Sequence, residues 1–80
     1  MEQQIIEQPK KLIEMVEVQS SNIKAVGYDS EAKELYVQYS SGTYKYLGVE
    51  PIIFEGLKLA ESKGKYMNLV KKTYKYEKVN

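Results

Sequence analysis

Residues 23–47, IKAVGYDSEAKELYVQYSSGTYKYL, decide the fold because their apolar and polar side chains alternate with a period of two. Tyr and Val recur in this segment and Thr43 lies among them, and these residue types suit a half-buried pleated surface. The alternation is broken by the polar residues 29–33 and by Ser40-Ser41-Gly42, where Gly42 can take the positive φ of a tight hairpin. The segment therefore predicts three antiparallel strands, over residues 23–28, 34–39 and 43–47.

The same alternation assigns side chains to the two faces of the predicted sheet. Leu35, Val37 and Tyr39 share one face of the second strand, and we expect this face to be buried. In the third strand, Tyr44 and Tyr46 also share a face and are placed inward. Rings that lie under a covering helix belong to the core, so this assignment makes Tyr44 and Tyr46 structural rather than ligand-stacking residues.

Two helical segments are predicted after the strands. Glu50-Pro51 marks a helix start, since Pro is favoured at the first helical position, and residues 52–61 carry apolar side chains at helical spacing. Residues 62–64 mark a junction to a second segment over residues 66–72, and residues 74–76 alternate in a final extended segment. The predicted fold class is α+β, a three-stranded antiparallel meander with helices packed on one face, and it leaves at least one sheet edge open.

The N-terminal residues are predicted to be an addition to this domain. Pro9 suits the start of a helix, and Leu12, Ile13 and Val16 continue a helical spacing, so a short helix is expected over about residues 9–16. We therefore divide the chain into an N-terminal segment, 1–17, and a domain, 18–80. The apolar face of this helix must be buried on the sheet or on a second copy, which favours a homo-oligomer, most simply a two-fold dimer.

Composition excludes several kinds of chemistry. The 80 residues include no Cys and no His, so disulfides, thiolate zinc sites and the usual general base at neutral pH are absent. Asp29, Glu31 and Glu34 cluster around the first turn but lack the ligand pattern of a calcium loop. We expect no enzyme activity, no metal and no cofactor. No run approaches the roughly 20 apolar residues of a membrane span, and no signal peptide is evident, so a cytoplasmic protein without membrane contact is expected.

Positive charge is concentrated at the C-terminal end. Residues 63–80 contain six lysines and one glutamate, in a chain whose net charge is only +1. Tyr66, Tyr74 and Tyr76 lie among these lysines, and aromatic rings beside ammonium groups suit the stacking of bases and the binding of phosphates. The alternative is that Tyr66 and Tyr74 complete the core while the lysines face water. The absence of Arg favours diffuse attraction over bidentate readout of bases.

The chain resembles the KTSC domain, because several motifs occur in the same order as in that family. The domain is named from the C-terminus of some lysyl-tRNA synthetases. These motifs are Val26-Gly27-Tyr28-Asp29, Tyr44-Lys45-Tyr46 and Ser62-Lys63-Gly64-Lys65-Tyr66, and the resemblance runs from about residue 18 to residue 76. The family also occurs as free-standing small proteins of bacteria and phages, and this chain is expected to be one of them. The resemblance implies RNA as a partner, and it leaves residues 1–17 without an assigned role.

Three hypotheses follow for function. The first is a non-catalytic binding module for a nucleotide-type ligand, with RNA as the first candidate. The second is a phage-type anti-defence protein that sequesters a small nucleotide immune signal in a pocket between subunits. The third is an adaptor or inhibitor that docks on a host protein through the sheet edge or the N-terminal helix.

Tyr36 is added to the candidate site because it lies on the uncovered face of the sheet, beside Lys24 and Lys45. The predicted ligand-binding residues are Tyr36, Tyr66, Lys71, Lys72, Tyr74, Lys75 and Tyr76.

Overall fold

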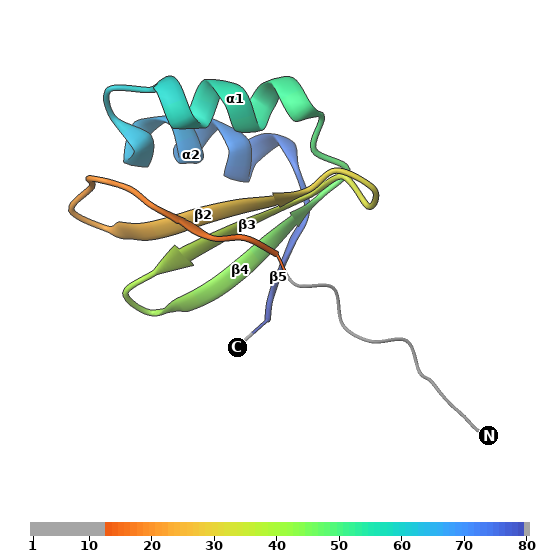
Figure 1. Ribbon diagram of the computed structural model, residues 1–80, viewed down its shortest axis with the longest axis horizontal. Coiled ribbons are helices and arrows are strands. Elements are labelled where there is room, and N and C mark those ends of the chain that lie inside the picture. Colours follow the sequence, from red (N-terminus) through yellow and green to blue (C-terminus); the bar gives the residue numbers. More distant parts are fainter. Residues whose placement is uncertain (1–12, 80) are drawn as a thin grey trace.

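The computed structural model describes residues 13–79 and folds them as one antiparallel sheet under a layer of two helices (Figure 1). The elements are β1 (Val16–Glu17), β2 (Ile23–Asp29), β3 (Glu34–Tyr39), β4 (Gly42–Leu47), α1 (Pro51–Leu59), α2 (Lys63–Thr73) and β5 (Tyr76–Lys78). The strands lie in the order in which they occur along the chain. The predicted α+β class is confirmed, whereas the prediction of three strands is wrong, since two short strands extend the meander at its edges.

The N-terminal edge differs most from the prediction. Residues 9–12 of the predicted helix lie outside the described residues, residues 13–15 are not helical, and Val16–Glu17 forms β1 on the edge of β2. A helix as short as the predicted one is marginal in water, whereas the edge of β2 offers unpaired backbone groups. The segment before β1 passes close to Gly27 of β2. Only glycine permits this approach, because a Cβ on Gly27 would lie 2.7 Å from the carbonyl oxygen of Glu14. Residues 13–16 are therefore not helical, and Val16 at the end of the expected helix is paired in β1 instead.

The two tight turns of the meander form as predicted, through different devices. After β2, the Asp29 carboxylate accepts hydrogen bonds from the backbone N–H groups of Glu31 (3.0 Å) and Ala32 (3.2 Å), and Lys33 takes a left-handed conformation at φ 57°. Between β3 and β4, Gly42 has φ 144°, which a side chain rarely allows. These turns set a register in which Leu35 pairs with Tyr46 and Val37 with Tyr44.

The last strand completes the sheet beside β4. Leu47 donates its backbone N–H to the Lys75 carbonyl, Val79 donates to the Thr43 carbonyl, and Tyr46 pairs with Tyr76. The extended conformation of this segment was predicted, but its place in the sheet was not. Three residues that include two charges give too weak a pattern to indicate a strand partner far along the chain.

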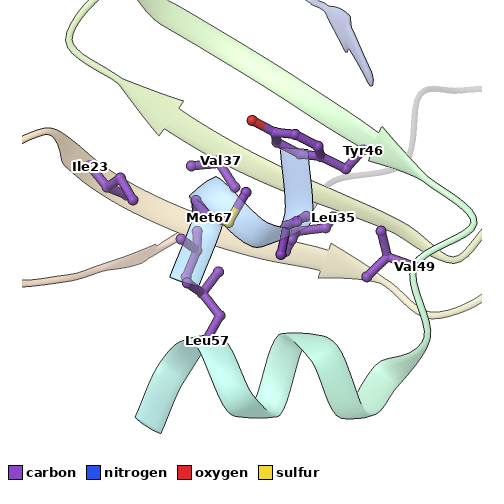
Figure 2. Close-up of a cluster of buried hydrophobic side chains, with 9 residues drawn as sticks. Ile23, Leu35, Val37, Tyr46, Val49, Leu57 and Met67 are labelled. Carbon is purple, nitrogen blue, oxygen red and sulfur yellow. The ribbon is translucent and has the colours of Figure 1, made fainter. Parts of the chain in front are cut away.

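The core lies between the inward face of the sheet and the two helices. Leu57 of α1 and Met67 of α2 point toward Leu35 and Val37 of the sheet, with Tyr46 beside them (Figure 2). Each of these five side chains is buried. The predicted inward face of β3 and the inward position of Tyr46 are therefore confirmed.

α1 begins where the sequence indicates, whereas α2 begins earlier than predicted. α1 follows Glu50 with Pro51 in its first turn, and α2 begins after Ser62, whose hydroxyl oxygen accepts a hydrogen bond from the Lys65 N–H (3.3 Å). α2 extends beyond the predicted range of 66–72 at both ends. No helix within residues 13–79 combines the length and the apolar character needed to cross a bilayer.

The helices touch where Tyr66 of α2 packs on Gly56 of α1. The Tyr66 hydroxyl donates a hydrogen bond to the Ile53 carbonyl oxygen (2.9 Å). A Cβ on Gly56 would lie only 2.3 Å from the Tyr66 hydroxyl oxygen, so the absence of a side chain at Gly56 is what allows this contact. Tyr66 therefore joins the two helices into one layer.

We expect Gly56→Ala to lower the free energy of unfolding by about 1 kcal/mol. The new methyl group displaces the Tyr66 hydroxyl and breaks its hydrogen bond, and this loss outweighs the roughly 1 kcal/mol that Ala gains over Gly inside a helix. Urea unfolding of a double-mutant cycle measures the effect. In a Tyr66→Phe background the same substitution should be neutral or stabilising, and an equal loss in both backgrounds would contradict the Tyr66 contact as its cause.

Candidate functional site

A pocket of about 370 Å³ opens between the sheet and α2, at the end of the sheet where β3 turns into β4. Its walls come from the start of β2, the hairpin turn, β4, β5 and one side of α2. The lining residues are Asn22, Ile23, Tyr39, Ser40, Ser41, Tyr44, Tyr46, Gly64, Met67, Asn68, Lys71 and Tyr76. Ligand pockets of roughly 300 to 1,000 Å³ are typical of small-molecule sites, so this one has room for a small ligand.

Four tyrosines form the sheet wall of the pocket. Tyr44 packs edge to face against Tyr39, with ring centroids 5.7 Å apart, and against Tyr76, at 6.0 Å. The rings of Tyr46 and Tyr76 are 5.3 Å apart and tilted. The register explains the grouping, because β4 brings Tyr44 and Tyr46 to one face and β5 pairs Tyr76 directly with Tyr46.

Exposure differs strongly among these four rings. Tyr46 is 1% exposed, Tyr39 and Tyr44 are partly buried, and Tyr76 is 51% exposed. Tyr46 therefore forms the base of the pocket, and Tyr76 is the ring most accessible to a ligand. Edge-to-face packing leaves ring faces on which a planar group can stack.

A hydrogen bond of 2.8 Å joins the hydroxyl groups of Tyr39 and Tyr46, and either can be the donor. Burial is the main cause that raises the pKa of both phenols above the ordinary value of 10.0. The hydrogen bond lowers the pKa of Tyr39 but does not offset its burial, whereas it raises the pKa of Tyr46 further. Both groups are therefore neutral at physiological pH, and neither supplies a base.

Lys71 brings positive charge to the tyrosine wall. Its ammonium nitrogen lies 5.5 Å from the centroid of the Tyr39 ring, within cation–π range. On α2, Gly64, Asn68 and Lys71 are separated by four and three residues, so they share the side of the helix that faces the pocket. Lys71 is the one charged side chain among the described residues that line the pocket.

Neutral polar groups from separate parts of the chain complete the pocket lining. Ser40 and Ser41 come from the hairpin turn, Asn22 from the residue before β2, and Asn68 from α2. Hydroxyl and amide groups both donate and accept hydrogen bonds. Together with Lys71, they give the pocket groups that can bind an anion and read the edge of a planar polar ring.

The structure brings only two of the predicted site residues, Lys71 and Tyr76, into the pocket. Tyr66 is instead engaged between the helices, and Tyr74 is partly buried against the core at the end of α2. These two positions follow the alternative stated above, in which the two tyrosines complete the core. Lys72 and Lys75 are exposed and do not line the pocket.

Tyr36 lies on the opposite face of the sheet from the pocket. Its neighbours in β3, Leu35 and Val37, are fully buried on the inward face, so Tyr36 points outward. The Tyr36 hydroxyl donates to the Glu34 carboxylate (3.1 Å), and the Lys45 ammonium lies 3.7 Å from the same carboxylate. The predicted residues therefore divide between two faces, and no single ligand the size of the pocket can contact Tyr36 and Tyr76 together.

Several residues that line the pocket were not predicted from the sequence. Tyr39 was placed inward but not proposed as a ligand contact, and Tyr44 was treated as core although it is only partly buried and lines the pocket. Asn22, Ser40 and Asn68 carry no motif. The one signal in the sequence was that Tyr39 and Tyr44 are both placed on the inward face of the sheet.

A comparison with protein-family models matches residues 19–76 to the KTSC domain. The chain belongs to the KTSC domain family. It is 40% identical over 62 residues to an uncharacterized protein of Stutzerimonas stutzeri strain A1501, and this match covers 76% of the chain and 87% of the relative. A protein of Tsukamurella paurometabola is 42% identical over 55 residues, which are 68% of the chain and 82% of that protein.

The crystal structure of a KTSC domain protein from Yersinia pestis has the same fold. The two structures superpose with a TM-score of 0.82 at 31% sequence identity, over 86% of this chain and all of the other. Every residue that lines the pocket falls between Asn22 and Tyr76, inside the KTSC match. The described lining of the pocket therefore lies within the KTSC domain.

We expect the phenols of Tyr39 and Tyr46 to ionise above pH 10. The unfolded chain releases these protons near pH 10 while the folded protein retains them, so their contribution to stability is complete below pH 10 and is lost as pH rises through the raised folded pKa values. A pH titration of phenolate absorbance measures this. Tyr39→Phe and Tyr46→Phe should each remove one late-ionising phenol, and a single step centred near pH 10 in the native protein would contradict the assignment.

Proposed function

We propose that this KTSC domain is a non-catalytic binding module for a nucleotide-type ligand, and that it holds one nucleotide in the tyrosine pocket. The observation that carries the proposal is the position of Lys71, whose ammonium group lies over Tyr39 in a wall that also contains Tyr44 and Tyr76. A base stacks on the accessible rings, where each base stacked on an aromatic ring contributes roughly 1 to 3 kcal/mol. Its phosphate binds Lys71.

Single-stranded RNA is the first candidate ligand, because a second lysine lies beside the pocket. Lys78 pairs with Tyr44 across β4 and β5, and directly paired residues of antiparallel strands lie on the same face of a sheet. An RNA strand with one base in the pocket therefore has two lysines, Lys71 and Lys78, available for its phosphates. The absence of arginine fits attraction to the backbone better than bidentate recognition of bases.

A free small nucleotide is the second candidate, and the size of the pocket favours it. The volume of about 370 Å³ is near the lower end of the range for ligand sites. The pocket between subunits that the sequence suggests stays a prediction. A role in sequestering a nucleotide signal would use the same contacts.

Lys71→Gln should weaken binding of a single-stranded RNA about tenfold. It should also reduce the slope of log K against log salt by about 0.7, the value for one lost phosphate contact on a single strand. Calorimetry at several salt concentrations measures both quantities. The matched control is Lys33→Gln, since Lys33 is exposed at the opposite end of the β2–β3 pair and should leave affinity and slope unchanged.

The location of the site is tested from both faces of the sheet. Gly64→Leu should abolish binding without unfolding the domain, because a Cβ at Gly64 meets no atom within 4 Å and the longer side chain enters the pocket. Tyr76→Ala should weaken binding at least about tenfold. If Tyr36→Ala weakened binding and these two variants did not, the ligand would lie on the outer face and the pocket assignment would be wrong.

Titration with mononucleotides distinguishes the two candidates. Tight binding of a mononucleotide, with no affinity for oligomers, would select the small ligand. Binding of neither class by the native protein would contradict the proposed function.

A further inference from the structure

Three large aliphatic side chains of the helix layer are exposed to solvent. Ile52 is 74% exposed and Leu59 is 83% exposed on α1, and Leu69 is 65% exposed on α2. The other exposed aliphatic residues among those described, Val16 and Val79, lie outside the helices. A single exposed leucine needs no explanation, but a group of such residues on one layer marks a surface that binds something.

The three side chains lie around the contact between the helices. Ile52 precedes Gly56 by four residues and Leu59 follows it by three, so both lie on the side of α1 that carries Gly56. Leu69 follows Tyr66 by three residues and lies on the same side of α2. Because Tyr66 packs on Gly56, these aliphatic groups lie near the junction of α1 and α2, and their high exposure places them on the solvent side of the helix layer. Figure 1 shows that both helices lie on one face of the sheet, so this side of the layer is open.

Charges of opposite sign border this surface on its two helices. On α1, Glu55 lies between Ile52 and Leu59 at helical spacing and is 62% exposed. On α2, Lys65 and Lys72 lie four residues before and three residues after Leu69, and α2 contains no acidic residue. α1 therefore presents a glutamate between two aliphatic side chains, and α2 presents an aliphatic side chain between two lysines.

We infer that this surface is the contact between two copies of the chain in a two-fold dimer. A two-fold axis that runs along the junction, parallel to the helices, places α1 of one copy against α2 of its partner, so that the same patch serves both subunits. The aliphatic groups then meet at the centre, and Glu55 faces the lysines of the partner's α2. Glu55 lies 3.4 Å from Lys58 of its own helix, and such an exposed pair is weak enough to exchange partners.

The dimer leaves the tyrosine pocket open. The pocket is lined by Gly64, Asn68 and Lys71, whereas the dimer surface uses Lys65, Leu69 and Lys72 of the same helix. α2 thus serves two surfaces, with one side toward the sheet and the other toward a second copy. The inference does not depend on the ligand proposed above.

Sedimentation equilibrium of the full chain over a range of concentrations tests the inference. The native protein should sediment as a dimer, and Leu59→Glu and Leu69→Glu should each weaken the dimer about a hundredfold or more, because a charge enters a dry contact. Both positions are exposed, so thermal unfolding followed by circular dichroism should show a folded domain. Val16→Glu is the matched control, an exposed aliphatic residue on the sheet edge, and should leave the dimer intact.

A charge exchange tests the pairing itself. Glu55→Lys alone should weaken the dimer, and combining it with Lys65→Glu and Lys72→Glu should restore the dimer, because the opposite signs then face each other again. A native protein that stays monomeric up to its solubility limit would overturn the inference. So would a dimer that survives both leucine substitutions, or a triple charge variant no better than Glu55→Lys alone.

Discussion

The buried ring of Tyr46 connects the core of this domain to its pocket. One side of the ring packs in the cluster that contains Leu35, Val37 and Met67, and the hydroxyl group reaches Tyr39 at the pocket. A phenol can be buried this deeply only if its hydroxyl finds a partner, since an unpaired buried polar group costs roughly 1 to 3 kcal/mol. The Tyr39–Tyr46 hydrogen bond meets that requirement, so the stability of the core and the shape of the pocket depend on the same side chain.

The pocket depends on strands that are not adjacent in the sequence. Tyr76 reaches the tyrosine wall only because β5 pairs with β4 after the chain has passed through both helices. β5 is three residues long and all three are exposed, so the hydrogen bonds that its flanking residues Lys75 and Val79 make with Leu47 and Thr43 hold the outer wall in place. A wall at a short edge strand is easily reached from solvent, which suits a site that binds and releases a ligand.

The tyrosines have different structural roles, which explains why composition alone suggests more ligand-binding tyrosines than the pocket contains. Eight tyrosines beside lysines suggest one large stacking surface, but the fold uses them differently. Tyr66 joins the helices through the Ile53 carbonyl, Tyr28 stacks on Phe54 with ring centroids 5.3 Å apart, and Tyr36 bonds to Glu34 on the outer face. A phenol carries both an apolar ring and a hydrogen-bonding group, so in a small domain it can complete a core or line a pocket, and its surroundings decide which.

Local pattern by itself determined the central meander, the inward side of Leu35, Val37 and Tyr46, and the start of α1. Alternation, turn residues and helix caps act between near neighbours, so one sequence carries them in full. Tertiary structure alone decided that Val16–Glu17 and Tyr76–Lys78 are edge strands, that Lys71 lies over Tyr39, and that Tyr36 and Tyr76 are on opposite faces. The physical reason is that a strand partner and a pocket wall come from residues far apart in the chain, whose approach depends on how the whole sheet and helix layer pack. Short segments with few apolar residues carry no signal of that packing.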